Sequence, residues 1–69
     1  MERNPVSSSN IVSVGYDEAA QTLEVEFSSG DVYQYYNVGA ALYEQFMGAP
    51  SKGQFLSYSI RNAYPYSKI

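Results

Sequence analysis

The segment Ser51-Lys52-Gly53 carries the residue types best suited to binding an anion. Ser51 and Gln54 have the spacing of a capping box, in which a serine side chain caps the first turn of a helix. A helix N-terminus offers unpaired backbone N–H groups and a partial positive charge, which favour phosphate or carboxylate. Lys52 adds a full charge, and Gly53 would let a ligand approach the backbone closely. The alternative is an ordinary helix cap with a solvated lysine, and the segment lacks the spacing of a nucleotide-binding P-loop.

Arg61 and Tyr64 are secondary candidates for the same contact. Residues 1–44 carry a net charge of −6, whereas residues 45–69 carry +3 and contain no acid. Weak basicity at one end suits a local anion contact better than a broad nucleic-acid surface. Lys52 and Arg61 are nine residues apart. In a regular helix each residue turns by about 100°, so the two lie on opposite faces and that helix alone does not join them in one patch. Arg61 could instead bond a helix C-terminal carbonyl or an acid of the sheet.

Aromatic side chains form a second candidate site. The chain has eight tyrosines and three phenylalanines in 69 residues, and three of the tyrosines fall within residues 31–36. Tyr33 and Tyr35 could stack on bases, as aromatic strand residues do in several RNA-binding sheets. If their rings point inward they belong to the hydrophobic core instead. The length of the preceding loop decides between these two interpretations.

The hairpin that carries these tyrosines has two possible registers. A three-residue loop over residues 28–30 places Tyr33 and Tyr35 on the apolar face, opposite Val25 and Leu23. A two-residue loop over residues 29–30 places them on the wet face, opposite glutamates. Gly30 as the last loop residue fits the left-handed position of a type I turn with a G1 bulge. The three-residue loop is therefore favoured.

Composition argues against most catalytic chemistry. The chain has no cysteine and no histidine, which removes disulfides, the commonest metal ligands and the usual general base. Ser51 has no histidine partner, and the adjacent Lys52 is badly placed to act as its base. We therefore expect no enzyme activity, no cofactor and no metal site. No apolar run approaches the roughly 18 residues of a membrane span, and we expect a cytoplasmic protein without a membrane partner.

Hydrophobic periodicity predicts an α+β fold, with a flexible leader over residues 1–9 and a single domain over 10–69. A three-stranded antiparallel sheet is expected at 11–16, 22–28 and 31–37, followed by two helices near 39–47 and 52–63 on one face. Asn37 is expected to cap the first helix, and Glu24 and Glu26 are expected to lie in water. The predicted core comprises Val14, Leu23, Val25, Phe27, Val38, Leu42, Phe46, Phe55 and Ile60.

Several short segments occur in an order that resembles a known family. They are Val14-Gly15-Tyr16-Asp17, Tyr33-Gln34-Tyr35, Ser51-Lys52-Gly53 and Ile60-Arg61 with Tyr64. From Ser9 to about Tyr66 the chain is similar to the KTSC domain, a module at the C-terminus of some lysyl-tRNA synthetases and in small free-standing bacterial proteins. Gly39 departs from the proline expected at the first helical turn. The resemblance implies no established biochemical activity, but the synthetase fusion suggests RNA binding.

We therefore expect a small non-catalytic binding module. RNA or tRNA is the partner implied by the family resemblance, contacted through the candidates Ser51, Lys52, Gly53, Arg61, Tyr64, Tyr33 and Tyr35. The alternative is a protein-interaction module that docks another protein through exposed tyrosines or an open sheet edge. The salt dependence of binding distinguishes the two functions, because binding of phosphate weakens as counterions compete with the protein.

Overall fold

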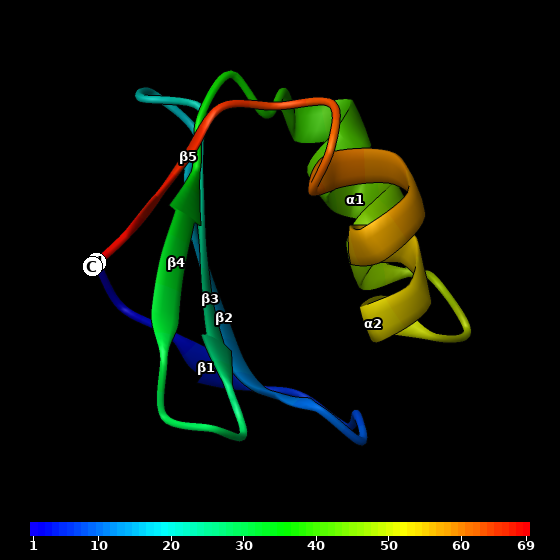
Figure 1. Cartoon of the computed structure of the whole chain (residues 1–69). Helices are drawn as coiled ribbons and strands as arrows, with labels where there is room; N and C mark the ends of the chain where they lie inside the picture. Colours follow the sequence, from blue (N-terminus) through cyan, green and yellow to red (C-terminus); the bar gives the residue numbers. More distant parts are fainter.

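A five-stranded antiparallel sheet packs one of its faces against two helical segments (Figure 1). The structure, a computed structural model, describes all 69 residues. The strands are β1 (Asn4–Pro5), β2 (Ile11–Asp17), β3 (Thr22–Phe27), β4 (Val32–Tyr35) and β5 (Tyr66–Lys68), and they are neighbours in that order. The helical elements are α1 (Ala40–Met47), α2 (Lys52–Phe55) and the π-helical turn η1 (Leu56–Ile60). The α+β class is as expected, but the expected three-stranded sheet is wrong in its number of strands.

The two strands absent from the prediction lie at the edges of the sheet. β1 falls within residues 1–9, which were expected to form a leader, and it pairs Asn4 with Val14 of β2. β5 pairs with β4, and the backbone amide of Ile69 continues this contact by donating to the Val32 carbonyl at 2.8 Å. β1 has two residues and β5 has three, which are too few to show a hydrophobic alternation in the sequence. Short edge strands of this kind cover the edges of the longer strands inside them.

The β3–β4 hairpin has the register of the three-residue loop. Leu23 lies opposite Tyr35 and Val25 lies opposite Tyr33. The amide of Gly30 donates to the Phe27 carbonyl at 2.9 Å, and Gly30 has a φ of +95°, which glycine adopts without a steric penalty. This register directs both tyrosines to the face of the sheet that the helices cover. Tyr35 is buried and Tyr33 is half-buried.

The first helix differs from the prediction at its start, and the second differs in its middle. The N-cap of α1 is Gly39, without a side-chain hydrogen bond. Asn37 does not cap this helix, because it takes up a left-handed conformation (φ +64°) in the preceding turn. Ser51 does cap α2, since its Oγ accepts a hydrogen bond from the Gln54 amide at 3.3 Å. The second helix is not regular to residue 63, because it widens into the π turn η1 and its helical elements end at Ile60.

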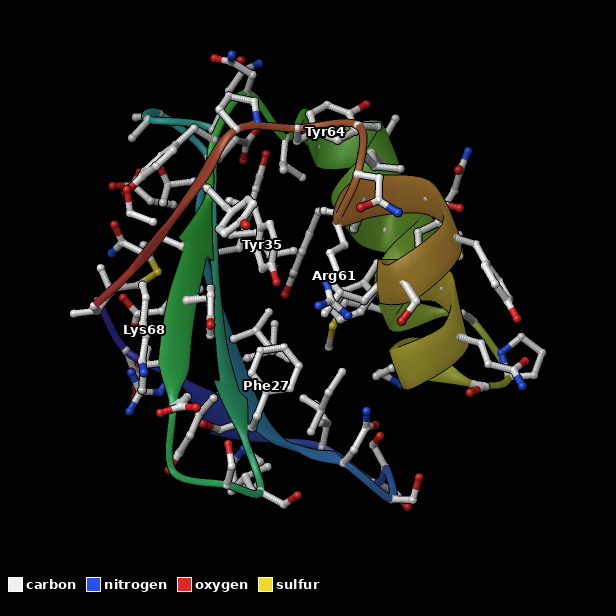
Figure 2. The ribbon with its side chains drawn as sticks, viewed as in Figure 1. Phe27, Tyr35, Arg61, Tyr64 and Lys68 are labelled. Atoms are coloured by element: carbon white, nitrogen blue, oxygen red, sulfur yellow. The ribbon has the colours of Figure 1, made fainter.

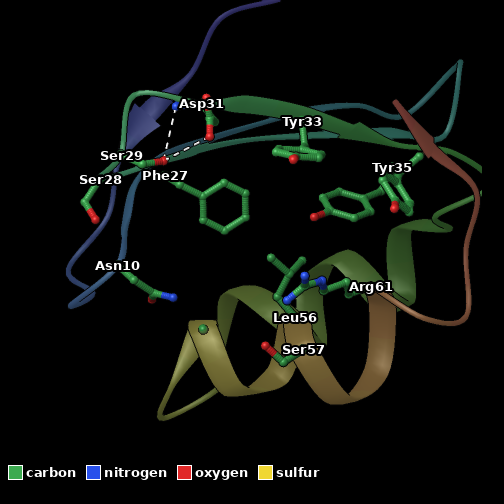
Figure 3. Close-up of a pocket in the computed structure, with 12 residues that line it drawn as sticks. Asn10, Phe27, Ser28, Ser29, Asp31, Tyr33, Tyr35, Leu56, Ser57 and Arg61 are labelled. Atoms are coloured by element: carbon green, nitrogen blue, oxygen red, sulfur yellow. Dashed lines mark hydrogen bonds between the residues drawn. The ribbon is translucent and has the colours of Figure 1, made fainter. Parts of the chain in front are cut away.

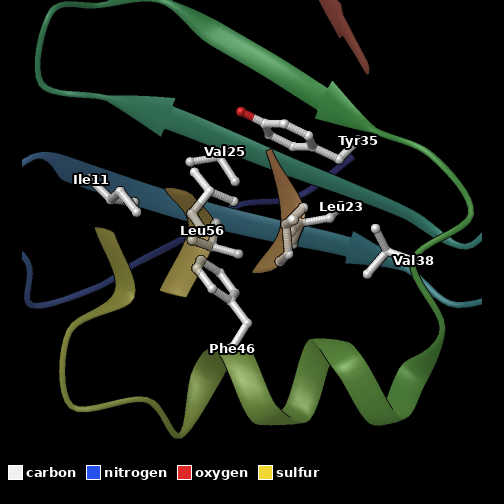
Figure 4. Close-up of a cluster of buried hydrophobic side chains, with 9 residues drawn as sticks. Ile11, Leu23, Val25, Tyr35, Val38, Phe46 and Leu56 are labelled. Atoms are coloured by element: carbon white, nitrogen blue, oxygen red, sulfur yellow. The ribbon is translucent and has the colours of Figure 1, made fainter. Parts of the chain in front are cut away.

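The core lies between the sheet and the helices (Figure 4). Six of the nine predicted core residues are buried, whereas Phe27, Leu42 and Phe55 are half-buried and pack against them. The prediction omitted Ile11, Tyr35 and Leu56. The buried cluster consists of Ile11, Val14, Leu23, Val25, Tyr35, Val38, Phe46, Leu56 and Ile60.

The other face of the sheet is not fully solvated, which corrects the expectation for Glu24. Only 7% of this residue is exposed. Gln34 Nε2 donates to one of its carboxylate oxygens at 2.8 Å, and the Arg3 guanidinium pairs with the other. These contacts hold the pKa of Glu24 below its usual value, the hydrogen bond from Gln34 most of all, although burial acts in the opposite direction. Glu26 is half-buried and accepts a hydrogen bond from Ser13.

Candidate binding cleft

An open cleft of about 380 Å³ separates the β3–β4–β5 side of the sheet from α2 and η1 (Figure 3). It is the larger of two hollows in the protein. We call it the aromatic cleft, because four aromatic rings form its sheet side. Its lining comprises Asn10, Phe27, Ser28, Ser29, Asp31, Tyr33, Tyr35, Gly53, Leu56, Ser57, Arg61 and Tyr66.

Strand pairing assembles the aromatic wall. Tyr33 and Tyr35 share a face of β4 because they are two residues apart, and β5 places Tyr66 opposite Tyr35. The ring of Tyr66 lies 5.9 Å from that of Tyr33 and 5.8 Å from that of Tyr35, between ring centroids. Phe27 meets Tyr33 edge to face at 5.7 Å. Such aromatic pairs are mutually attractive, so the wall is held in shape before any ligand arrives.

The four rings differ in what they offer to a ligand. Tyr35 is only 3% exposed, whereas Tyr66 is 55% exposed. Burial raises the pKa of Tyr35, against the opposing effect of the positive charge of Arg61. The phenol of Tyr35 therefore stays neutral at physiological pH. Tyr66 is the ring with free surface for stacking, and Tyr35 serves as its support.

Arg61 projects from the helical side toward the sheet and lies beside Leu56 (Figures 2 and 3). In a regular α-helix two residues five positions apart are separated by about 140° around the axis. Here the Arg61 amide donates to the Leu56 carbonyl at 2.8 Å, a bond that closes a wider π turn. This turn lets both side chains line the cleft. π-helical turns of this kind occur frequently at functional sites.

The Arg61 guanidinium has no acidic partner. The ion pairs of the protein join Arg3 to Glu24 and Glu26, and Lys68 to Asp31. The structural role considered for Arg61, a bond to an acid of the sheet, is therefore not present. An arginine without a carboxylate, beside aromatic rings, leaves its five N–H donors available for an anion.

Asp31 is the acid that lines the cleft, at the end nearest the hairpin loop. Its Oδ1 lies 3.3 Å from the Lys68 ammonium, and its Oδ2 accepts a hydrogen bond from Ser29 Oγ at 3.3 Å. Lys68 thus offsets the negative charge of Asp31. The uncompensated charge at the cleft is the positive charge of Arg61.

The start of α2 is more fully occupied than expected. A Cβ atom on Gly53 would lie 2.5 Å from Asn10 Oδ1, so the missing side chain leaves room for Asn10. Gly53 still lines the aromatic cleft, and Ser51 lines the neighbouring smaller hollow. Lys52 is half-buried and lines neither. The segment 51–53 thus meets the cleft only through Gly53.

The structure brings together four of the seven candidate residues. Gly53, Arg61, Tyr33 and Tyr35 line the cleft, whereas Tyr64 packs against the core instead. Several lining residues were not among the seven candidates, and of these Tyr66 contributes most because of its exposed ring. The three residues of β5 directly follow Pro65 and are too short a pattern to identify a strand from the sequence.

The described side chains include no cluster of three or more acids that could hold a metal ion. None of the helices is long and apolar enough to cross a membrane.

Comparisons with known proteins point to one family. The sequence model of the KTSC domain matches residues 7–64. A KTSC domain protein from Yersinia pestis, known from its crystal structure, superposes with a TM-score of 0.94 at 41% identity, over 99% of this chain and 96% of its own. An uncharacterised protein of Stutzerimonas stutzeri is 43% identical over 100% of this chain and 99% of its own length.

A lysine–tRNA ligase of Trichormus variabilis is 39% identical over 54 residues, or 78% of this chain. The match covers 10% of that ligase. The chain therefore resembles a small segment of the larger enzyme.

Proposed function

The chain belongs to the KTSC domain family, and we propose that it is a non-catalytic module that binds single-stranded RNA in the aromatic cleft. The observation that supports this proposal best is the placement of Arg61. Its guanidinium lines a cleft whose opposite wall is aromatic, and it has no acidic partner. A nucleotide supplies both complementary groups, a phosphate for the arginine and a flat base for the rings.

The choice of a single strand follows from the shape of the site. Sequence-independent binding of single strands relies on bases stacked on aromatic side chains beside a cationic backbone contact. In double-stranded RNA the bases are stacked on each other and are not free to meet a protein ring. Tyr66 offers the exposed ring and Arg61 offers the cation. The likeness to a segment of lysine–tRNA ligases, enzymes that act on a tRNA, agrees with an RNA ligand.

The charge of the cleft sets the expected strength of binding. The net charge of the protein is −3, which opposes a broad phosphate contact. With one uncompensated cation at the cleft, the logarithm of the binding constant should fall with the logarithm of the salt concentration, with a slope of about −0.7. Binding should therefore be modest in strength and only weakly dependent on salt.

The proposal is tested by titrating fluorescently labelled single-stranded RNA, and separately tRNA, into the protein at low salt. Arg61→Ala should weaken binding by about tenfold or more, because a charge-assisted hydrogen bond is lost. Lys52→Ala is the matched control, since it removes the same charge from the same helical segment outside the cleft, and it should change affinity by less than about threefold. No binding by the unmodified protein at high micromolar concentration, or an equal loss in both variants, contradicts the proposal.

The protein-interaction alternative is less favoured. One of its two expected surfaces was an open sheet edge, and β1 and β5 leave edges of only two and three residues. An extended partner strand needs a longer row of free backbone groups. Capture of a protein partner with an affinity unchanged between low and high salt would support this alternative instead.

A further inference from the structure

A second hollow lies next to the aromatic cleft and shares three lining residues with it. This polar groove has a volume of about 350 Å³ and is lined by Ser9, Asn10, Ser51, Gly53, Gln54, Ser57 and Tyr58. Asn10, Gly53 and Ser57 line both hollows, and we call them the junction. Because Gly53 has no side chain, the junction carries only two side chains. The two hollows therefore adjoin, and the Asn10 side chain lies against Gly53 where they meet.

No carboxylate, lysine or arginine lines the groove, but one large aromatic side chain does. Tyr58 is 83% exposed, the highest value among the large hydrophobic residues. It is not among the residues that pack against the core, whereas Leu56 and Ile60 on either side of it are buried. The ring therefore contributes nothing to the packing of the domain. A free ring beside an uncharged groove offers a base a surface to stack on.

The groove also suits the backbone of a nucleic acid. Ser51, Ser57 and Asn10 supply neutral hydroxyl and amide groups, which hydrogen-bond phosphate oxygens and ribose hydroxyls. No carboxylate lines the groove to repel a phosphate. The Ser51 hydroxyl oxygen already accepts a bond from the Gln54 amide, and it keeps its proton to donate to a ligand.

We infer that the groove is a second nucleotide subsite in which Tyr58 stacks on the neighbouring base. This inference rests on the proposed function, and it specifies the ligand as a strand of at least two nucleotides. One base lies against the aromatic wall near Tyr66, with a phosphate at Arg61. The backbone then crosses the junction, and the next base lies on the Tyr58 ring.

Ligand length tests this inference. A mononucleotide and a single-stranded tetranucleotide are titrated into the unmodified protein, Tyr58→Ala, Tyr58→Phe and Tyr66→Ala, with amide chemical shifts as the readout for the weak mononucleotide. Tyr58→Ala should bind the tetranucleotide about tenfold more weakly than the unmodified protein, because one base–aromatic stack is lost. The same variant should leave mononucleotide binding unchanged, and Tyr58→Phe should retain the tetranucleotide affinity because it keeps the ring. Tyr66→Ala should weaken both ligands.

The possible failures are distinguishable. If Tyr58→Ala binds the tetranucleotide as well as the unmodified protein does, while Arg61→Ala binds it weakly, the second subsite is wrong and the proposed function stands. An equal loss of both ligands in Tyr58→Ala also overturns the subsite. If no RNA binds the unmodified protein, both proposals fail. Because Tyr58 is exposed, its variants should melt within a few degrees of the unmodified protein, which serves as the folding control.

Discussion

Tyr35 lies directly opposite Leu23 on the neighbouring strand β3, and both side chains are buried beneath the helices. Tyr35 therefore belongs to the core and also backs the aromatic wall of the cleft. Tyr35→Ala should lower the free energy of unfolding by about 3–5 kcal/mol, as for other large aromatic residues removed from cores. Tyr35→Phe keeps the ring and should cost less than about 1.5 kcal/mol. Urea denaturation of both variants measures these costs, and a Tyr35→Ala variant as stable as the unmodified protein would refute the burial.

The register of this hairpin depends on Gly30. Its φ of +95° lies in a region that other residues adopt only with strain, although a Cβ atom there would meet no neighbour within 4 Å. Gly30→Ala should therefore destabilise the protein through the backbone alone, by about 1–2 kcal/mol. Gly48→Ala is the control, because Gly48 has a φ of −89° and alanine there should be neutral or mildly stabilising. Equal stability of the two variants in thermal melts would contradict this account of the turn.

Burial of Glu24 makes part of the stability dependent on pH. Its carboxylate is held by Gln34 and Arg3, so its folded-state pKa is lower than its unfolded value of about 4.5. A lowered pKa gives stability that is fully present above the unfolded value and is lost as the pH falls through the folded value. Glu24→Gln should therefore flatten the loss of stability below about pH 4.5.

Glu44→Gln provides the comparison for this pH effect, because Glu44 is exposed and makes no ion pair. It should keep the acid sensitivity of the unmodified protein. Chemical denaturation at several pH values between 3 and 7 separates the two variants. Identical pH profiles for Glu24→Gln and the unmodified protein would show that this carboxylate does not contribute.

The Asp31–Lys68 ion pair should lower the net positive charge at the cleft, because Asp31 neutralises Lys68. Asp31→Asn removes the acid and leaves Lys68 without its partner, so a phosphate at the cleft would meet two cations. RNA affinity at low salt should rise by roughly two- to fivefold, the range for a pair this exposed. Glu18→Gln removes one negative charge from a residue that does not line the cleft and should raise affinity less. A fall in affinity in Asp31→Asn would mean that Asp31 itself contacts the ligand.

The hairpin and its face could be predicted because loop length and one glycine specify them. The three-residue length of the loop, with Gly30 as its last residue, determined the face of β4 on which Tyr33 and Tyr35 lie. The favoured register already places Gln34 opposite Glu24. The burial of Glu24 could not be predicted, because its other partner, Arg3, comes from the N-terminal segment and approaches only when β1 joins the sheet. An alternating sequence pattern indicates which residues of one strand share a face, but it does not indicate that a segment distant in the sequence covers that face.

The candidate site was predicted only in part, and Arg61 shows why. A regular helix places Arg61 opposite Lys52, and the structure keeps the two apart, because Arg61 lines the cleft and Lys52 does not. The π turn at Leu56–Ile60, which lets Arg61 and Leu56 line the cleft together, could not be predicted, because no residue type in this stretch indicates such a turn. The expected anion contact at Ser51, Lys52 and Gly53 remains a prediction, although Ser51 and Asn10 already occupy much of the helix start.

Mapping of amide chemical shifts during titration with a single-stranded RNA tetranucleotide tests the central claim most directly. The largest shifts should fall on residues that line the aromatic cleft and the polar groove, namely Tyr33, Tyr35, Ser57, Tyr58, Arg61 and Tyr66, and Arg61→Ala should suppress them. Shifts confined to residues 51–54, or to the opposite sheet face around Gln34, with the cleft residues unchanged, would contradict the account.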